Sequence, residues 1–188
     1  MKEYQEELSE INHMLENKNK EYETLASTDS LTGLYNRYKF SELYLSSYTA
    51  MVQRHNKMSI ILLDIDFFKK VNDTHGHNVG DTVLRQISHA LLKILRDIDI
   101  VCRWGGEEFI VLLPTASLEN AVMLAEKLRV YIQDMKIDIV DSITASFGVC
   151  EVKEGEDMQS AVDRADKALY LAKNNGRNCV KTESSHQS

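Results

Sequence analysis

Proline is almost absent from this chain: Pro114 is the only one, which excludes an extended proline-rich linker. The three cysteines, Cys102, Cys150 and Cys179, are odd in number and widely spaced, and no CxxC or Cys/His zinc pattern occurs. Free thiols in a reducing cytoplasm are therefore expected. No apolar run approaches membrane-spanning length and no signal peptide is visible, so we expect a cytoplasmic protein or the cytoplasmic domain of a larger, membrane-attached one.

Basic charge is also scarce. The 22 lysines and arginines are outnumbered by 29 aspartates and glutamates, which gives a net charge of −7. This balance disfavours broad electrostatic binding to nucleic acid and argues against a polymerase with a basic template groove. A metal-bound polyphosphate ligand stays compatible with it. The 188 residues, 43% hydrophobic and 27% charged, predict one soluble globular domain with an appendage.

Residues 1–27 contain neither glycine nor proline and carry apolar residues at alternating three- and four-residue steps. This a/d pattern predicts a parallel two-stranded coiled coil, with a solvated helix or a helix packed back on the domain as the alternatives. We expect a globular domain at residues 28–181 and a disordered tail at residues 182–188. The apolar positions are Tyr4, Leu8, Ile11, Leu15, Tyr22 and Leu25.

The globular part alternates helix and strand patterns, with a hairpin in the middle. The strand at 58–65 is nearly all apolar, which indicates burial on both faces of a sheet. We therefore predict an α/β (α+β) fold with a ferredoxin-like, palm-type mixed sheet, an antiparallel central hairpin and flanking helices. The expected elements are helix 36–56, strand 58–65, a polar functional loop 64–81, helix 81–95, hairpin strands 98–102 and 109–113, helix 118–135, strand 143–152, helix 158–173 and strand 179–180.

The tip of the hairpin has the sequence Trp104-Gly-Gly-Glu-Glu-Phe109. Two glycines between strand-like runs predict a tight turn, because glycine adopts the positive φ that primed turns need. Glu107 and Glu108 follow at once, although acidic residues are poor strand formers. The tip is therefore either a solvated turn with ordinary surface charge or part of a cation site.

Asp64 stands at the end of the buried strand, where an isolated charge is costly. If the hairpin pairs beside that strand, Glu107 and Glu108 come close to Asp64 and form an acidic cluster without basic partners. Such oxygen-only ligands suit Mg²⁺, with Mn²⁺ as the alternative. Two metal ions on the cluster would suit in-line phosphoryl or nucleotidyl transfer.

Cationic groups for a polyphosphate are present in Lys69, Lys173 and Arg177. Backbone amides around Phe67 and Phe68 could add N–H donors. The two lysines are equally compatible with a solvated surface.

Asn72 and Asp81 can recognise a purine edge. A carboxylate that accepts from N1–H and the 2-amino group selects guanine, and an amide can share that edge. Asp81 is also explained as an acid at a helix N-terminus, and the two roles can coexist. His77 is expected to order its loop by hydrogen bonding rather than to bind metal, because no second ligand stands at a zinc spacing, and His75 is expected on the surface.

Several motifs follow one another at compatible spacing. They are Asp29-Ser-Leu-Thr-Gly-Leu-Tyr-Asn-Arg37, Asp64-Ile-Asp-Phe-Phe-Lys69, Asn72-Asp-Thr-His-Gly-His77, Gly80-Asp81, Arg103-Trp-Gly-Gly-Glu-Glu-Phe109, Ser146-Phe-Gly148, Ala165-Asp-Lys-Ala-Leu-Tyr170, Lys173 and Gly176-Arg-Asn178. Together they resemble the GGDEF family of diguanylate cyclases over residues 28–181, which favours the cation site over the solvated turn. The signature has Glu where the family name has Asp, a variant that keeps the carboxylate.

The resemblance implies that the domain joins two GTP into cyclic di-GMP and releases two pyrophosphates. Two Mg²⁺ ions per site would be held by Asp64, the Ile65 carbonyl and Glu107, with Glu108 as a further ligand. Glu107 would also accept the 3′-hydroxyl proton, and Lys69 would stabilise transition-state charge. The implied substrate contacts are phosphate binding by Lys69, Lys173 and Arg177, guanine recognition by Asn72 and Asp81, flanking of the base by Leu31 and Leu84, and lining of the nucleotide by His77, Phe67, Phe68, Gly105 and Gly106.

Arg96-Asp-Ile-Asp99 matches the RxxD site at which the family's product inhibits the enzyme. An arginine pairs with guanine and phosphate, and Asp99 can accept from guanine. A helper arginine of some relatives maps onto Lys127, which keeps the charge but loses bidentate geometry. The alternative for Arg96 is a helix C-terminal arginine with a chance aspartate nearby.

Each 3′-hydroxyl must attack the other GTP, so we expect a homodimer with one GTP per subunit and facing active sites. The coiled coil would tether the two domains and receive a signal from an upstream sensory domain. Three alternatives stay open: a receptor that holds GTP or cyclic di-GMP without chemistry, a passive dimerisation relay, and a polymerase-like nucleotidyltransferase. The set Asp64, Lys69 and Glu107 speaks against the receptor, and no nucleic-acid partner is expected.

Overall fold

The computed structural model describes residues 14, 18, 26–138 and 140–183. The predicted coiled coil of residues 1–27 lies almost entirely outside these described residues, and so does the tail from residue 184. None of the described helices is both long enough and apolar enough to cross a lipid bilayer. The fold is therefore that of the globular part.

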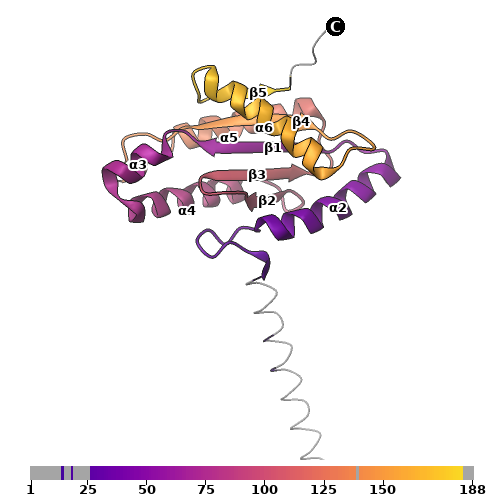
Figure 1. Cartoon of the computed structure of the whole chain (residues 1–188), viewed down its shortest axis with the longest axis horizontal. Helices are drawn as coiled ribbons and strands as arrows, with labels where there is room; N and C mark the ends of the chain where they lie inside the picture. Colours follow the sequence, from indigo (N-terminus) through magenta and orange to yellow (C-terminus); the bar gives the residue numbers. More distant parts are fainter. Residues whose placement is uncertain (1–13, 15–17, 19–25, 139, 184–188) are drawn as a thin grey trace, which may run out of the picture.

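One five-stranded sheet forms the middle of the domain, in the order β2-β3-β1-β4-β5 (Figure 1). The central strand β1 is antiparallel to both of its neighbours, β3 and β4, and only the edge pair β4–β5 is parallel. The predicted mixed sheet with an antiparallel centre is confirmed. The strands are β1 Ser59–Ile65, β2 Ile100–Arg103, β3 Glu108–Leu113, β4 Ala145–Glu151 and β5 Val180–Thr182.

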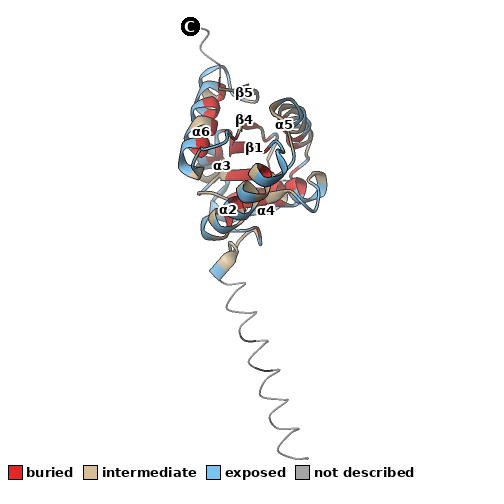
Figure 2. Cartoon of the chain, turned by 90° about the vertical axis from the view of Figure 1, so that its right-hand side faces the viewer, coloured by how far each residue is buried: buried red, intermediate tan, exposed pale blue. Residues whose placement is uncertain are grey.

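Helices cover both faces of the sheet and make a three-layer molecule (Figure 2). Every residue of β1 is buried, because its side chains alternate between two apolar clusters. Ile61 and Leu63 join the cluster under α4 and α5, whereas Ile60 and Leu62 join the one under α2 and α6. The covering helices are α2 Arg37–Arg54, α4 His77–Ile94, α5 Leu118–Gln133 and α6 Met158–Asn174.

Helix α6 packs very closely on β4 because of Gly148. A Cβ at this position would lie 2.1 Å from the carbonyl oxygen of Ala165 and 2.3 Å from the backbone nitrogen of Leu169. A real Cβ cannot come that near to backbone atoms, so any larger residue would push the helix away from the sheet. The close packing sets the reach of the last turn of α6, which carries Lys173.

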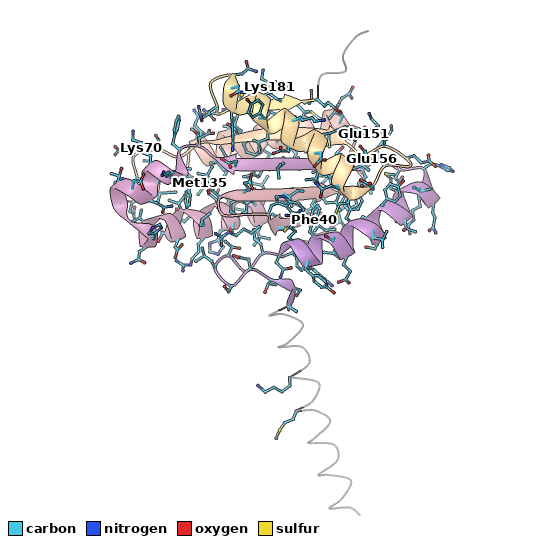
Figure 3. All side chains as sticks on the ribbon, viewed as in Figure 1. Phe40, Lys70, Met135, Glu151, Glu156 and Lys181 are labelled. Carbon is cyan, nitrogen blue, oxygen red and sulfur yellow. The ribbon has the colours of Figure 1, made fainter. Side chains whose placement is uncertain are left out.

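The two ends of the sheet carry different side chains. Glu151 closes β4 at one end, where it pairs in register with Ser59, and Asp64 of β1 pairs with Ser146 at the other end. In Figure 3, Lys70 of the short helix α3 (Phe68–His75) lies at the far end of the molecule from Glu151. The predicted site residues of β1 therefore belong to the α3 end.

The segment 64–81 is not the loop that we predicted. It contains α3 and the first turn of α4, which starts at His77, four residues before the predicted start of that helix. Helix α3 starts at an unexpected point because Phe67 caps it in a left-handed conformation, without a side-chain cap. Gly76, with φ +85°, separates the two helices. The functional residues of this segment therefore sit on helices.

The ordered domain extends beyond residue 181. Thr182 lies in β5, opposite Val149 of β4. The carboxylate of Glu183 pairs with Arg164 of α6 at 3.1 Å. The first two residues of the predicted tail therefore belong to the folded part, and residues 184–188 lie outside the described ones.

Candidate active site

Two acidic segments meet where β1 ends beside the hairpin. Asp64 of β1 pairs in register with Glu108, the first residue of β3. The Ile65 N–H donates to the Glu107 carbonyl oxygen at 3.3 Å, which holds the hairpin tip alongside the end of β1. The predicted pairing of the hairpin with the Asp64 strand is confirmed, and it brings the acidic residues of both segments together.

Asp64 is buried, and its charge is only partly balanced. Its exposed fraction is 7%. Burial raises its pKa to about 6; the Lys173 ammonium opposes this rise, and the negative charges of Glu107 and Glu108 add to it. Lys173 Nζ lies 2.8 Å from Asp64 Oδ2. The expectation of a cluster without basic partners is therefore wrong, because the last turn of α6 supplies an ammonium group.

The hairpin tip is built differently from the predicted turn. Residues 104–107 connect the strands, and the N–H groups of Trp104 and Gly105 donate to the Glu108 carbonyl oxygen at 2.8 and 3.3 Å. Neither Gly105 nor Gly106 has a positive φ, so the prediction of a primed turn is wrong. Gly105 provides space instead, since a Cβ would lie 2.8 Å from Glu108 Oε2, and Gly106 has open space beside it. The tip therefore offers a ligand a backbone without side chains.

Helix α3 begins with an exposed aromatic residue. Phe67 has φ +57° and is 62% exposed, whereas Phe68 is buried. The Phe67 carbonyl oxygen accepts the N–H groups of Lys70 and Val71 at 2.8 and 3.3 Å. The amides of Phe68 and Lys69 lie in this first turn and have no acceptor within the helix. They are the N–H donors that the sequence predicts for a phosphate.

The three predicted phosphate-binding cations come from α3, from α6 and from the turn after α6. Lys69 is exposed in the first turn of α3, and Lys173 is 33% exposed in the last turn of α6. Arg177 follows α6, and its guanidinium carbon lies 4.6 Å from the centroid of the Phe67 ring. Lys173 and Arg177 thus contact residues at the end of β1 and the start of α3, next to the carboxylates.

Asp66 is a residue of this region to which the sequence analysis gave no role. Its carboxylate is 4% exposed and accepts three hydrogen bonds, from Ser146 Oγ at 2.6 Å, Thr144 Oγ1 at 2.7 Å and the Asn178 N–H at 3.0 Å. Asp66 therefore ties the end of β1 to β4 and to the turn after α6. The sequence did contain a signal for this role. Asp66 is a second acid two residues beyond Asp64, and two hydroxyl residues, Thr144 and Ser146, stand near the start of another strand.

Of the residues predicted to read guanine, Asn72 of α3 lies against Gly80 of α4, the residue before Asp81. A Cβ on Gly80 would lie 2.0 Å from Asn72 Oδ1, so the Asn72 side chain rests on the space that glycine leaves. Asp81 follows Gly80 directly and stands in the second turn of α4. The explanation of Asp81 as an acid at the helix N-terminus is therefore weakened, because that effect is confined to the first turn.

Two of the remaining predicted nucleotide contacts, His77 and Leu84, belong to α4. Leu84 is buried in the core cluster on the α4 side of the sheet, and the half-buried Leu31 packs against that cluster. His77 is the exposed first residue of α4, so it orders no loop, contrary to our expectation. His75 is exposed, as predicted.

Arg96, Asp99 and Lys127 line one small cavity of about 170 Å³. The Arg96 N–H donates to Asp99 Oδ2 at 2.9 Å, and the Asp99 N–H donates to the Arg96 carbonyl oxygen at 2.9 Å. These bonds close the turn between α4 and β2. The structure thus brings together the three residues predicted to bind product.

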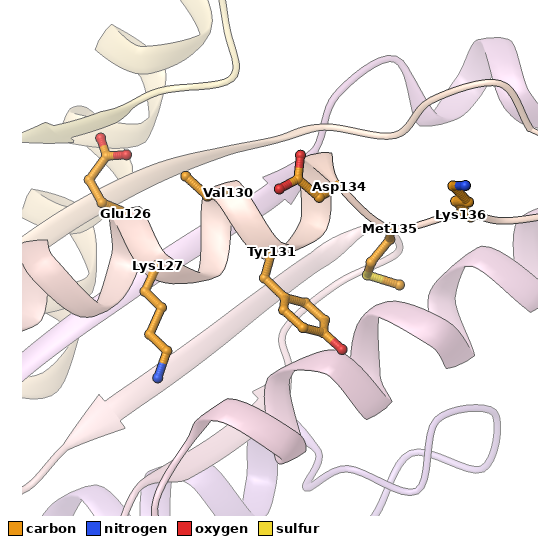
Figure 4. Close-up of a pocket in the computed structure, with 7 residues that line it drawn as sticks. All are labelled: Glu126, Lys127, Val130, Tyr131, Asp134, Met135 and Lys136. Carbon is orange, nitrogen blue, oxygen red and sulfur yellow. The ribbon is translucent and has the colours of Figure 1, made fainter.

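A larger cavity of about 820 Å³ lies along α5 and contains none of the residues predicted for the active site. Figure 4 shows its lining, in which Lys127 and Tyr131 project to the same side of α5. Lys93 of α4 contacts Tyr131, with its Nζ 3.3 Å from the hydroxyl. The lining of this cavity comes from α5 and the residues that follow it, and it contains no residue of the carboxylate cluster.

The sequence matches one protein family, described as "Diguanylate cyclase, GGDEF domain", over residues 26–179. Diguanylate cyclase VdcA of Vibrio cholerae is 42% identical over 158 residues, which cover 81% of this chain. The chain spans less than half the length of the curated relatives it matches, 45% in the case of VdcA.

Solved structures share the fold. The coiled coil and GGDEF domain of DgcB from Caulobacter crescentus, in complex with c-di-GMP, matches 93% of this chain and 96% of its own, with a TM-score of 0.83 and 30% identity. The active GGEEF domain of a diguanylate cyclase from Vibrio cholerae matches 81% of this chain and 98% of its own, with a TM-score of 0.76 and 33% identity. The second carries the same variant signature as this chain.

Proposed function

The chain belongs to the GGDEF family of diguanylate cyclases, and from this membership we propose that it condenses two GTP into cyclic di-GMP and two pyrophosphates. Each domain binds one GTP. The observation that carries the proposal is the meeting of Asp64 with Glu107 and Glu108 at the end of β1, beside Lys173 and Arg177. Acidic and cationic groups adjoin there as a metal-bound triphosphate requires.

The donor atoms fit divalent metal ions, which GGDEF cyclases generally use. Asp64, the Ile65 carbonyl and Glu107 hold two Mg²⁺ ions, or Mn²⁺, with Glu108 as a further ligand. Only oxygen donors are present, and the pKa of Asp64 is raised, chiefly by burial and further by the charges of Glu107 and Glu108, against the opposing effect of Lys173. Among the described residues no three His, Cys, Asp or Glu side chains yet stand together as a metal site. Bound metal would supply positive charge at the phosphates, and Lys173 would then leave Asp64 for a phosphate oxygen.

The residues around the cluster take separate parts in the proposed reaction. Glu107 accepts the proton of a 3′-hydroxyl, whose oxygen forms a bond to the α-phosphorus of the other GTP. The bond from that phosphorus to the bridging oxygen breaks, and pyrophosphate leaves. Lys69, Lys173 and Arg177 stabilise the phosphate charge, helped by the free amides at the start of α3. A second, symmetric transfer closes the ring.

Guanine is recognised between α3 and α4. Asn72 and Asp81 hydrogen-bond the base edge. The packing of Asn72 on Gly80, the residue before Asp81, supports this role. Leu31 and Leu84 flank the base, and His77 lines the nucleotide. Phe67, Phe68, Gly105 and Gly106 complete the nucleotide-binding surface.

Two domains must face each other for this reaction, which makes the active form a homodimer. We propose that residues 1–27 form the coiled coil that joins the two domains of residues 28–183 and carries a signal from an upstream sensory domain. The structure of DgcB supports this division, because it comprises a coiled coil and a GGDEF domain and matches 93% of this chain. A cytoplasmic location, where GTP is available, follows from the same proposal.

Product inhibition is proposed at the cavity of Arg96, Asp99 and Lys127. Arg96 pairs with a guanine or phosphate of cyclic di-GMP, and Asp99 accepts from a guanine. Asp99 already accepts from the Arg96 backbone, so one of its oxygens is engaged. Lys127 contributes charge without bidentate geometry.

The proposed function is tested by incubating the purified protein with GTP and Mg²⁺ and resolving the products by chromatography. We expect cyclic di-GMP from the native chain and at least ~100-fold less from Glu107→Ala, since that change removes a metal ligand and the proton acceptor. Glu119→Ala, an exposed acid on α5, is the matched control and should keep the native rate. Bound GTP without any cyclic product would support a receptor instead.

A further inference from the structure

The turn after α6 has a rare backbone conformation. Gly176, Arg177 and Asn178 have φ values of +97°, +63° and +44°, so three consecutive residues are left-handed and two of them are not glycine. L-residues visit this region singly and at a cost. Such conformations persist only where the surrounding structure holds them, and they gather at functional sites. Arg177, a proposed phosphate contact, is one of the strained residues.

Two hydrogen bonds hold the backbone of this turn. The Arg177 N–H donates to the Ala172 carbonyl oxygen of α6 at 3.1 Å. The Asn178 N–H donates to Asp66 Oδ2 at 3.0 Å, and that carboxylate is anchored in turn by two hydroxyl groups of the β4 segment. The backbone is therefore held at the second and third residues of the left-handed stretch.

The side chain of Asn178 is held by α5, which lies on the other face of the sheet from α6 (Figure 2). Asn178 Oδ1 accepts from Arg129 Nη1 at 3.1 Å, and Asn178 Nδ2 donates to Gln133 Oε1 at 2.9 Å. Arg129 Nη1 also donates to Gln133 Oε1 at 2.9 Å, which closes a three-membered ring of hydrogen bonds. Each polar group of the Asn178 amide thus has a partner on α5.

We propose that Arg129 and Gln133 are positioning residues that, through Asn178, hold Arg177 beside Phe67 in readiness for the phosphates of GTP. The inference rests on the proposed function, in which Arg177 contacts phosphate. The guanidinium of Arg177 already lies over the exposed Phe67 ring at 4.6 Å. A side chain ordered before binding loses less freedom when the ligand arrives, so the ring of hydrogen bonds strengthens the binding of a triphosphate.

Nucleotide binding tests the proposal without turnover. We would titrate 3′-deoxy-GTP, which lacks the attacking hydroxyl, and GMP, which lacks the β- and γ-phosphates, by calorimetry in Mg²⁺. Arg129→Met should weaken 3′-deoxy-GTP binding about tenfold and leave GMP binding within about twofold, because only the phosphate contact is loosened. Glu126→Gln is the matched control: it removes the 2.7 Å ion pair on the other side of Arg129 and should leave both affinities unchanged.

Two further variants separate positioning from general structure. In an Arg177→Ala background, Arg129→Met should weaken 3′-deoxy-GTP binding no further, since a residue that acts through Arg177 has nothing left to position. Asn178→Gly keeps the left-handed backbone without strain but removes both side-chain bonds, and it should reproduce the loss seen with Arg129→Met.

Several results would overturn the inference. They are equal weakening of 3′-deoxy-GTP and GMP by Arg129→Met, additive losses with Arg177→Ala, or native 3′-deoxy-GTP affinity in Asn178→Gly. If the native chain binds neither nucleotide, that result would instead contradict the proposed function itself. The two failures are therefore distinguishable.

Discussion

At the scale of single residues, Asp64 is buried although the proposed site needs it charged. Burial raises the pKa of Asp64 from its ordinary value of 3.8 to about 6 in the folded protein. Between these values the folded chain binds more protons at Asp64 than the unfolded chain does. The contribution of Asp64 to the free energy of unfolding therefore falls as the pH rises through this window, by up to about 3 kcal/mol.

Replacing this carboxylate should stabilise the metal-free protein. We expect Asp64→Asn to raise the melting temperature by a few degrees at pH 8, because the buried charge beside Glu107 and Glu108 is gone and Lys173, 33% exposed, can be solvated. The gain should shrink towards pH 4, where native Asp64 is protonated. Thermal unfolding between pH 4 and 8 measures both effects, and a variant less stable than the native chain at pH 8 would contradict them.

Glu156 provides a control of opposite sign. Burial alone would raise its pKa, but hydrogen bonds from Arg164 and from the Lys153 backbone outweigh burial and hold the pKa below its usual value. Its stabilisation is present at neutral pH and is lost as the pH falls through the folded pKa. Glu156→Gln should therefore lower the melting temperature at pH 8, with a difference that disappears in acid.

Sequence reasoning at this scale found the acidic residues but not their partners. Asp64 could be singled out because a carboxylate at the end of an apolar strand is costly without a counter-charge. The pairing of Lys173 with Asp64 depends on how closely α6 approaches the sheet, which the Gly148 contact sets in three dimensions. Asp66 was missed for the same reason, since its three donors come from two distant segments.

At the scale of elements, the packing of α3 against α4 places the proposed guanine-reading pair. Gly80→Ala would put a Cβ 2.0 Å from Asn72 Oδ1, and the flexible amide would turn away. We expect GTP affinity to fall about tenfold, which is the size of one lost hydrogen bond to the base, while ATP binding stays as weak as before. The affinities for GTP and ATP can be measured in competition, from the shift in melting temperature as each nucleotide is added.

Asn72→Ala is the reference for that change. It should reproduce the loss of GTP affinity, and Gly80→Ala combined with Asn72→Ala should add nothing, because the two substitutions act on one side chain. Unchanged GTP affinity in Gly80→Ala would show that Asn72 does not read the base from this position.

Strands were easier to predict than helix starts. The continuous apolar runs of β1 and β3 predicted their burial, and pairing of the β2–β3 hairpin beside β1 predicted the antiparallel centre. The helices in 64–81 were missed because α3 is short and is capped by Phe67 in a left-handed backbone conformation, which no residue pattern predicts. The positive φ expected at Gly105 and Gly106 was wrong, since a longer connection needs no primed turn.

At the scale of the whole molecule, one domain binds only one of the two GTP molecules that the proposed reaction joins. Its carboxylates and cations serve one GTP, and the second GTP must be presented by another copy. The net charge of −7 on each chain opposes that meeting, and a tether raises the effective concentration of the two domains. The a/d pattern of residues 1–27 could be read from the sequence, but whether two chains use it cannot be read from a single chain.

The most direct test of the proposed dimeric cyclase follows cyclic di-GMP formation from GTP and Mg²⁺ over a dilution series, for the native chain and for Leu15→Pro. We expect the specific activity to fall on dilution once the dimer dissociates, and to fall at higher protein concentrations in Leu15→Pro, because proline would break the proposed coiled-coil helix of residues 1–27. At high concentration the two chains should reach the same rate. A specific activity independent of dilution in both chains would contradict the coiled-coil dimer, and bound nucleotide without cyclic product at any concentration would contradict the cyclase.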